Sequence, residues 1–524
     1  MSKIVIYDTT LRDGAQGEGI SFSVEDKIKI ARKLDDFGVD YIEGGWPGSN
    51  PKDIEFFESI KSVKFKNAKL TSFGCTRRPK FTAATDPLIK NLVDSGSLAI
   101  ALFGKSWDFH VTSALRIPLE QNLEMIYDSV NYLKSLGREV IFDAEHFFDG
   151  YKANPEYAMK SLEAAADGGA DALVLCDTNG GSLPIEVGDI TETVCKRFKT
   201  VVGAHIHNDS GLAIASSVTA VQRGAAHVQG TINGYGERCG NANLCAIIPI
   251  LELKLGYQCV PTGKIEEITE LSRFVDEIAN LLPDERQPFV GRCAFAHKAG
   301  VHVDAVTKNE STYEHIDPGC VGNNRRLLVS ELAGGSTVAQ KASKLGIDLG
   351  KKSPEVKAIC DMVANLEHNG YSFEGAEASF ELLLKKSLGK YRKLFDLVGF
   401  RVIVEKRGPN EQPITEATLK ISVDGREAFT VAEGDGPVHA LDNALRLALR
   451  QFYGKELAKI KLADFKVRVV NSREGTAAKV RTVIESTDHA EAWSTVGVST
   501  NIIEASWAAL ADSVEYGLLK HLPK

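Results

Sequence analysis

The feature that most constrains this chain is a repeated strand–helix pattern in its first half. Residues 3 to 255 contain eight repetitions of a short apolar run, a polar turn and a helical segment, with strands expected at 3–8, 40–46, 69–75, 97–103, 139–144, 172–177, 201–207 and 227–232. The run ALVLC at 172–176 lacks polar alternation, which is typical of parallel strands covered on both faces. Eight such units predict a (β/α)8 barrel, the TIM-barrel fold. A doubly wound sheet is the alternative, but the first strand lacks a dinucleotide-binding glycine fingerprint.

The rest of the chain is expected to form two further parts. After residue 260 the strand–helix alternation stops and helical segments dominate, including 264–280, 337–345 and 351–369. A block that mixes strands and helices begins near residue 392 and is large enough to fold alone. We therefore expect a catalytic barrel over residues 1–265, a helical linker region over 266–391 and a C-terminal α+β regulatory domain over 392–524.

Composition excludes several classes of function. The net charge is −8 and there is no extended basic patch, so nucleic acid is not an expected partner. No apolar run reaches the roughly 20 residues of a membrane-spanning helix, and the first residues do not resemble a secretory signal. The nine cysteines are dispersed without a Cys-x-x-Cys pair, which indicates reduced thiols in a cytoplasmic protein. Small molecules and other copies of the chain are the expected partners.

Chemically reactive side chains follow the expected barrel strands. Arg12 and Asp13 come directly after the first strand, and His205 and His207 end the seventh. Because strand side chains alternate, the two imidazoles lie on the same face. Functional residues of such barrels lie at the carboxyl ends of the strands. Further polar residues expected there are Glu43, Glu145, His146, Asp177, Thr178, Asn179 and the segment 234–241.

A carboxylate and two co-facing histidines predict a divalent metal site. Mixed oxygen and nitrogen ligands with open positions suit Mg²⁺, Mn²⁺ or Zn²⁺, whereas a structural zinc site is usually closed and rich in thiolate. Such a metal can act as a Lewis acid on a chelating 2-keto acid, and Arg12 can stabilise a developing oxyanion. The residues therefore predict chemistry on a keto acid.

Three motifs resemble one enzyme family. They are DTTLRDG at 8–14, GAHIHND at 203–209 and NGYGERCGN at 233–241. Together they resemble the metal-dependent Claisen-condensing synthases, which include 2-isopropylmalate, homocitrate and citramalate synthases and, more distantly, hydroxymethylglutaryl-CoA lyase. The resemblance extends to EGDGPV at 433–438 and TVGVSTNII at 495–503, which are similar to the family's C-terminal allosteric domain. It implies acetyl-CoA as a co-substrate and feedback by an end-product amino acid.

The resemblance also implies roles for individual residues. Those that it implies as metal ligands are Asp13, His205, His207 and Asn241. In the substrate pocket, Arg12 would contact the keto-acid oxygen, Glu145 would act in catalysis and Thr178 would hold the substrate carboxylate.

Two residues of the linker region are implied as catalytic by the resemblance alone. Judged from the sequence, the histidines of the segment 295–304 are ordinary. The family, however, brings a histidine and a tyrosine from this region to another subunit's barrel, and His302 and Tyr313 match those motifs. A homodimer is therefore implied.

One departure from the family pattern bears on the substrate. After the second strand the isopropylmalate synthases usually carry EAGFP, whereas this chain has EGGWP at 43–47, which is most similar to the citramalate synthases. This implies condensation of acetyl-CoA with pyruvate to (R)-citramalate, followed by thioester hydrolysis, in isoleucine biosynthesis. Trp46 can either shorten the pocket that holds the side chain of the keto acid or serve only to pack against neighbouring residues. The alternatives are a 2-isopropylmalate synthase acting on 2-ketoisovalerate, a homocitrate synthase and a non-catalytic amino-acid sensor.

Overall fold

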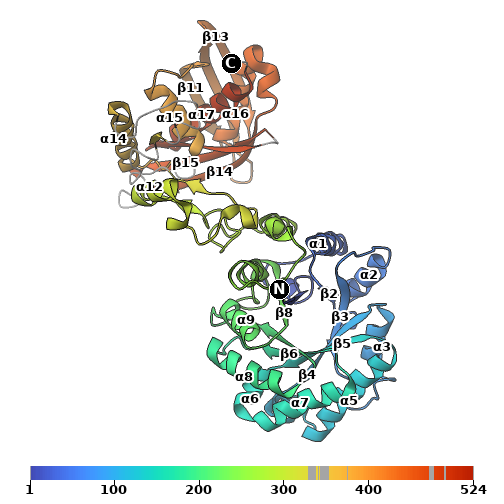
Figure 1. Ribbon diagram of the computed structural model, residues 1–524. Helices are drawn as coiled ribbons and strands as arrows, with labels where there is room; N and C mark the ends of the chain where they lie inside the picture. The colour runs from blue at the N-terminus through green and yellow to red at the C-terminus, as the bar shows by residue number, and fades with distance from the viewer. Residues whose placement is uncertain are drawn as a thin grey trace. The chain divides into compact units, whose positions relative to one another are not determined.

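The chain forms two compact units. The computed structural model describes residues 2–328, 338–339, 342, 353–373, 376–470, 477–488 and 491–522 (Figure 1). One unit contains residues 1–295 and 315–325, and the other contains 296–314 and 326–524. We describe each unit by itself. Most of the helix expected at 337–345 lies outside the described residues, and the domain limits at 265 and 391 stay a prediction.

The first unit is a closed barrel of eight parallel strands. β1 pairs in parallel with both β2 and β8, and every other strand pairs with its neighbours in sequence order. The (β/α)8 prediction is therefore confirmed. The strands are β1 (Val5–Asp8), β2 (Tyr41–Gly45), β3 (Lys69–Cys75), β4 (Ala99–Lys105), β5 (Glu139–Glu145), β6 (Ala172–Asp177), β7 (Val201–Ile206) and β8 (His227–Gly230).

Helices between the strands form the outer ring of the barrel, as Figure 1 shows. Their ends follow local sequence signals. Ser23 and Asp26 form a capping box at the start of α1, and Gly38 ends that helix in the left-handed conformation at φ 99°. The helices of this unit are α1 (Val24–Phe37), α2 (Pro51–Ile60), α3 (Pro87–Asp94), α4 (Asp108–His110), α5 (Leu119–Ser135), α6 (Phe147–Ala153), α7 (Pro155–Gly168), α8 (Pro184–Arg197), α9 (Ala213–Gln222), α10 (Leu244–Pro249) and α11 (Ile268–Ile278).

Two apolar layers stabilise the barrel. The larger lies between the strands and the outer helices and includes Ile30, Leu34 and Phe142. A smaller cluster, which includes Tyr7 and Val174, fills the inside of the barrel. All six residues of β6 are buried, in agreement with the unbroken apolar run seen in the sequence. Because side chains fill the interior, the barrel is a packed core rather than a pore.

The second unit ends in two modules with the same order of elements. Each is a three-stranded antiparallel sheet followed by a long helix. The first module contains β11 (Asp396–Glu405), β12 (Ile414–Val423), β13 (Arg426–Gly434) and α16 (Pro437–Leu457). The second contains β14 (Lys461–Val469), β15 (Val480–Thr487), β16 (Ala492–Ser499) and α17 (Ile502–His521). Sequence reasoning missed β13, although its burial alternates along much of its length as in a half-covered strand.

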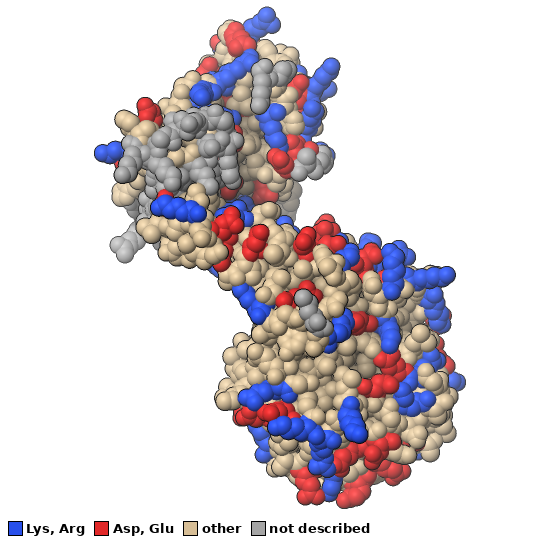
Figure 2. All heavy atoms as spheres, in the orientation of Figure 1, with Lys and Arg blue, Asp and Glu red and all other residues tan. Residues whose placement is uncertain are grey.

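Shorter elements precede these modules in the second unit. The two-residue strands β9 (Ala296–His297) and β10 (Arg326–Leu327) pair in parallel. The helices are α12 (Gly300–Lys308), α14 (Pro354–His368) and α15 (Glu377–Ser387). On the face of the barrel unit seen in Figure 2, acidic and basic side chains are interspersed. Among the described residues, no helix combines the length and apolar character needed to cross a membrane.

A candidate metal centre at the barrel mouth

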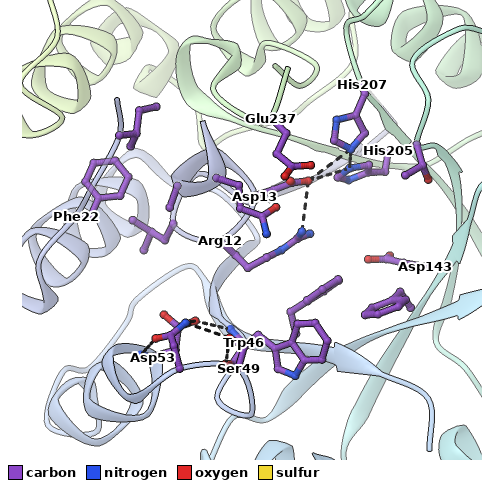
Figure 3. Close-up of a pocket in the computed structure, with 18 of the residues that line it drawn as sticks. Arg12, Asp13, Phe22, Trp46, Ser49, Asp53, Asp143, His205, His207 and Glu237 are labelled. Carbon is purple, nitrogen blue, oxygen red and sulfur yellow. Dashed lines mark hydrogen bonds and ion pairs between the residues drawn. The ribbon is translucent and has the colours of Figure 1, made fainter. Parts of the chain in front are cut away.

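Three buried side chains converge at the carboxyl end of the barrel. Asp13 lies in the turn after β1, and His205 and His207 lie at the end of β7. The Asp13 Oδ2 atom is 3.2 Å from His205 Nε2 and 3.8 Å from His207 Nε2, and the two Nε2 atoms are 3.4 Å apart. Figure 3 shows the carboxylate directed at both imidazoles. These are the three residues in which the sequence predicted a metal site.

The geometry and chemistry of this cluster fit a divalent cation. Metal–ligand bonds of about 2.0–2.2 Å place adjacent ligand atoms roughly 3–3.5 Å apart, close to the separations found here. Two histidines and one carboxylate leave coordination positions open for a substrate. The buried Asn241 Oδ1 atom and His207 Nδ1 atom have no hydrogen-bond partner among the described residues. Asn241 forms a β-bridge with His207, so this amide oxygen is available beside the cluster.

Asp13 and His207 are held in the protonation states that bind a metal ion, whereas His205 must give up a proton to do so. Burial raises the pKa of Asp13, but the Arg12 guanidinium and the hydrogen bond to His205 outweigh it and keep this carboxyl well below its usual range. Burial opposes protonation of His205, but the bond to Asp13 prevails and raises its pKa. Burial lowers the pKa of His207 to about 3, which keeps its imidazole neutral. An ionised carboxylate and a neutral imidazole are the forms that bind metal.

Arg12 is held beside the cluster by a buried glutamate. Its Nε atom donates to Glu43 Oε1 at 2.5 Å, and its Nη1 atom is 3.5 Å from Asp13 Oδ2. Glu43 is fully buried and also accepts hydrogen bonds from Tyr7 and Thr9. The guanidinium carbon lies 3.8 Å from the centre of the Phe73 ring, which is a cation–π distance. These contacts hold the Arg12 guanidinium in one orientation, beside Asp13.

A cavity of about 600 Å³ opens at the cluster. Its lining includes Arg12, Asp13 and an aromatic wall of Trp46, Phe73 and Phe103. Figure 3 shows Trp46 apart from Asp13, across Arg12. The Trp46 ring packs edge-on against both phenylalanines, with centroid distances of 5.9 and 5.6 Å. The wall places apolar surface in the same cavity as the cationic Arg12.

Of the other residues predicted at the strand ends, Glu145 and Thr178 line the cavity, and Glu145 forms an ion pair with Lys105. Three do not line it: Asp177 accepts a hydrogen bond from Ser182, and His146 and Asn179 contact Asp149. The Thr178 hydroxyl accepts a hydrogen bond from the backbone N–H of His146 at 2.9 Å. Glu237, from the loop after β8, lies close to Asp13 and His207 in Figure 3.

His302 and Tyr313 belong to the second unit, so the structure does not bring them to this cavity within the barrel unit. They do lie together, since their ring centroids are 4.2 Å apart. Both are exposed. Their pairing agrees with a joint role, which stays a prediction.

Sequence reasoning missed two polar residues inside the barrel. Asp143 lies two positions before Glu145 on β5, and Gln229 lies two positions after His227 on β8. Both are buried, and the Gln229 Nε2 atom donates to Asp143 Oδ1 at 3.0 Å. The two-residue period of the strands was the available signal, because it points Asp143 to the same side as Glu145.

A second cavity, of about 550 Å³, lies in the C-terminal modules between α16 and β14. Apolar side chains and charged side chains share its wall. The apolar residues are Val438, Ile460, Leu462 and Phe465, and the polar ones are His439, Asp442, Arg446 and Lys461. Arg446 is fixed by two hydrogen bonds from its Nε atom to Asp442, at 2.8 and 2.9 Å.

The fold and the site define a class of protein. It has a barrel with a candidate metal centre of two histidines and one carboxylate, and a C-terminal part built of two α+β modules. Family models agree with this class. The HMGL-like model matches residues 3–275, the homocitrate synthase post-HMGL domain-like model matches 289–370, and the LeuA allosteric (dimerisation) domain matches 374–518.

Similarity over the whole length identifies the particular family. The chain is 56% identical to an (R)-citramalate synthase of Aquifex aeolicus, over 99% of this chain and 98% of the relative. It is 54% identical to an (R)-citramalate synthase of Geobacter sulfurreducens, with 99% and 98% covered. Identity to a 2-isopropylmalate synthase of Methanocaldococcus jannaschii is 30%, with 99% and 95% covered. The chain belongs to the (R)-citramalate synthase family, and the resemblance seen in its motifs is confirmed.

Proposed function

We propose that this enzyme condenses acetyl-CoA with pyruvate to form (R)-citramalate, the first step of an isoleucine-forming route. The single observation that carries the proposal is the buried Asp13, His205 and His207 cluster at the barrel mouth, in a chain more than half identical to (R)-citramalate synthases along its length. The absence of disulfides among its nine cysteines, all of them described residues, supports a cytoplasmic location.

Asp13, His205 and His207 would hold the metal, with the Asn241 amide oxygen beside them. The buried carboxylate and imidazoles fit Mg²⁺ or Mn²⁺, and Zn²⁺ is a further option. When bound, such an ion supplies Lewis-acid chemistry to the carbonyl and carboxylate oxygens of a 2-keto acid. The side chains of this cavity then position the substrate and transfer protons.

The bond-forming step needs a carbanion equivalent and a stabilised oxyanion. A base removes a proton from the acetyl methyl group, and the resulting enolate carbon attacks the ketone carbon of pyruvate. Arg12, fixed by Glu43, lies where it can stabilise the negative charge that develops on the former ketone oxygen. Thr178, at the end of β6, would hold the pyruvate carboxylate. Water then hydrolyses the thioester and releases free CoA.

Proton transfer is assigned to residues of two subunits. Glu145 lies in the cavity, where it forms an ion pair with Lys105. His302 and Tyr313 would enter the barrel mouth of the partner subunit and complete the acid–base set. This arrangement makes the homodimer the active form.

The aromatic wall supports pyruvate as the acceptor. Trp46, Phe73 and Phe103 present large rings to the cavity, so less room remains for the side chain of the keto acid. Pyruvate carries only a methyl group there, whereas 2-ketoisovalerate carries an isopropyl group. The 2-isopropylmalate synthase alternative requires that these rings leave space for a branched side chain.

The cavity between α16 and β14 supports feedback by an aliphatic amino acid. Ile460 and Phe465 provide apolar surface, and Asp442 and Arg446 provide charges for an ammonium and a carboxylate group. We infer isoleucine as the effector, because it is the end product expected of this reaction.

A panel of 2-keto acids tests the proposed function. Release of the CoA thiol is measured with the full-length protein, acetyl-CoA and pyruvate, 2-ketobutyrate or 2-ketoisovalerate, with and without isoleucine or leucine. We expect the highest kcat/KM with pyruvate, inhibition by isoleucine, and loss of activity on chelation that added Mn²⁺ or Mg²⁺ reverses. Asp13→Ala should lower kcat by at least about 100-fold, since it removes a metal ligand. A preference for 2-ketoisovalerate would establish the alternative instead.

A further inference from the structure

A buried chain of polar side chains crosses the barrel interior behind the candidate metal centre. It runs from His205 on β7 through Gln229 on β8 to Asp143 on β5. The His205 Nδ1 atom is 2.8 Å from Gln229 Oε1, and Gln229 Nε2 is 3.0 Å from Asp143 Oδ1. All three side chains are buried, with Gln229 at 0% exposure, so solvent cannot replace these contacts.

The orientation of the Gln229 amide sets the order of donors and acceptors along this chain. Its Nε2 atom donates to Asp143 Oδ1, so the amide nitrogen faces β5. The amide oxygen then faces His205, and an amide oxygen can only accept. When His205 gives up its Nε2 proton to bind a metal, its remaining proton is therefore held on Nδ1, and the Nε2 lone pair is free for the ion that Asp13 would share.

The imidazole of His207 has no comparable hydrogen bond to hold its ring. His207 Nδ1 is buried without a hydrogen-bond partner among the described residues. The barrel therefore fixes the ring of one histidine and leaves the other to be oriented by the bound ion. Metal-binding histidines usually donate their second ring N–H to an acceptor that sets their orientation.

We propose that Gln229 and Asp143 are positioning residues that hold His205 in the tautomer and orientation required for metal binding. The inference rests on the proposed metal centre and adds to it a pair of residues that never touches the ion. It predicts that metal affinity depends on the acceptor at position 229 rather than on the volume of that side chain.

Mn²⁺ binding to the metal-free, full-length protein tests this inference without substrate. Gln229→Met keeps a similar volume but lacks a strong acceptor. Gln229→Glu keeps an acceptor for His205 and, because two buried carboxyl groups in contact share a proton, also keeps a hydrogen bond to Asp143. Titration followed by electron paramagnetic resonance should give about 10- to 100-fold weaker Mn²⁺ binding for Gln229→Met, and binding within about threefold of the wild type for Gln229→Glu. The apparent Tm of both proteins in chelator is measured alongside.

Two outcomes would overturn the inference, and they can be distinguished. If Gln229→Met binds Mn²⁺ as tightly as the wild type, Gln229 does not position His205. If Asp13→Ala also binds Mn²⁺ normally, the ion lies elsewhere and the proposed metal centre itself fails. Should Gln229→Met not fold, Asp143→Leu decides, because it removes the acceptor that holds the Gln229 amide and should still weaken Mn²⁺ binding.

Discussion

At the scale of single residues, the two neighbours Arg12 and Asp13 differ because different partners hold them. Arg12 is fixed by a buried glutamate and an aromatic face, so its charge is directed into the cavity. Asp13 is stabilised as a carboxylate by Arg12 and by two imidazoles. One turn after β1 therefore provides both a candidate metal ligand and a cation for the substrate.

The size of Trp46 is expected to limit the acceptor. Trp46→Leu enlarges the cavity beside Phe73 and Phe103, so a larger keto-acid side chain fits. Because one methylene is worth about 1–3 kcal/mol in such a pocket, the ratio of kcat/KM for 2-ketobutyrate over pyruvate should rise roughly tenfold. Trp107→Leu is the matched control, since Trp107 does not line the cavity. An unchanged ratio of kcat/KM values would mean that Trp46 packs against its neighbours without limiting the size of the keto acid.

His227 is expected to make the barrel sensitive to acid. Burial lowers the pKa of this histidine to about 3, while an unfolded chain titrates it near 6.5. The unfolded state therefore binds more protons between these values, and stability is lost as the pH falls below about 6.5. Between pH 7 and pH 5 the contribution is about 2 kcal/mol.

The variant His227→Phe isolates this effect. Phenylalanine keeps a ring against Tyr7 and Tyr41 and removes the titratable group. The fall in apparent Tm from pH 7 to pH 5 should be smaller for the variant than for the wild type. Equal pH dependence in the two proteins would contradict the prediction.

At the scale of elements, the loop after β8 positions Asn241 through its glycines. Gly240 has φ 87°, and a Cβ atom there would lie 2.0 Å from the carbonyl oxygen of Gly234. The same loop is held by hydrogen bonds from Asn241 N to Gly234 O and from Asn208 N to Gly240 O, at 3.0 and 2.9 Å. The backbone of this loop therefore sets the place of Asn241 beside His207.

Gly240→Ala should disturb this arrangement. The clash and the positive φ cost at least about 1–2 kcal/mol, so the loop must shift. We expect a lower apparent Tm and weaker Mn²⁺ binding by titration. Gly181→Ala is the control, because no atom lies within 4 Å of a Cβ there and the effect should stay below about 0.5 kcal/mol. Normal Mn²⁺ binding by Gly240→Ala would argue against a role for the loop.

The sequence predicted those elements whose pattern is local. The eight barrel strands follow from apolar runs, and His205 and His207 share a face because of the strand period. β13 is an exception, because it was missed although it is nine residues long and follows β12 after the turn Asp424–Gly425, a local hairpin signal. The contact of Gln229 with Asp143 depends on how β5 and β8 face each other across a closed barrel, which no local pattern reveals. His302 and Tyr313 carry no local signal, and only the family resemblance singled them out.

At the scale of the whole molecule, the residues proposed for catalysis are divided between two units. The metal cluster and its cavity belong to the barrel, whereas His302 and Tyr313 belong to the second unit. The proposed function joins them across a homodimer, so each active site requires two chains.

Mixing two inactive variants tests this division. Asp13→Ala lacks a metal ligand and His302→Ala lacks the proposed acid–base group, so each homodimer should be nearly inactive. After co-expression, a hybrid dimer contains one site with both residues intact. Random pairing should give roughly a quarter of wild-type specific activity in CoA release. If no activity returns, the two residues act within one chain or His302 is not required in this way.

The edge strands of the C-terminal modules bear on how such an enzyme behaves in the cell. β11 and β14 are mostly exposed, and they present Val398, Val404 and Val469 to the surface at about half of their full exposure. Surfaces of this kind are sites of chain-to-chain pairing. In the proposed homodimer the fraction of chains that are paired falls as their concentration falls, so lower expression would reduce the flux more steeply than the number of chains alone.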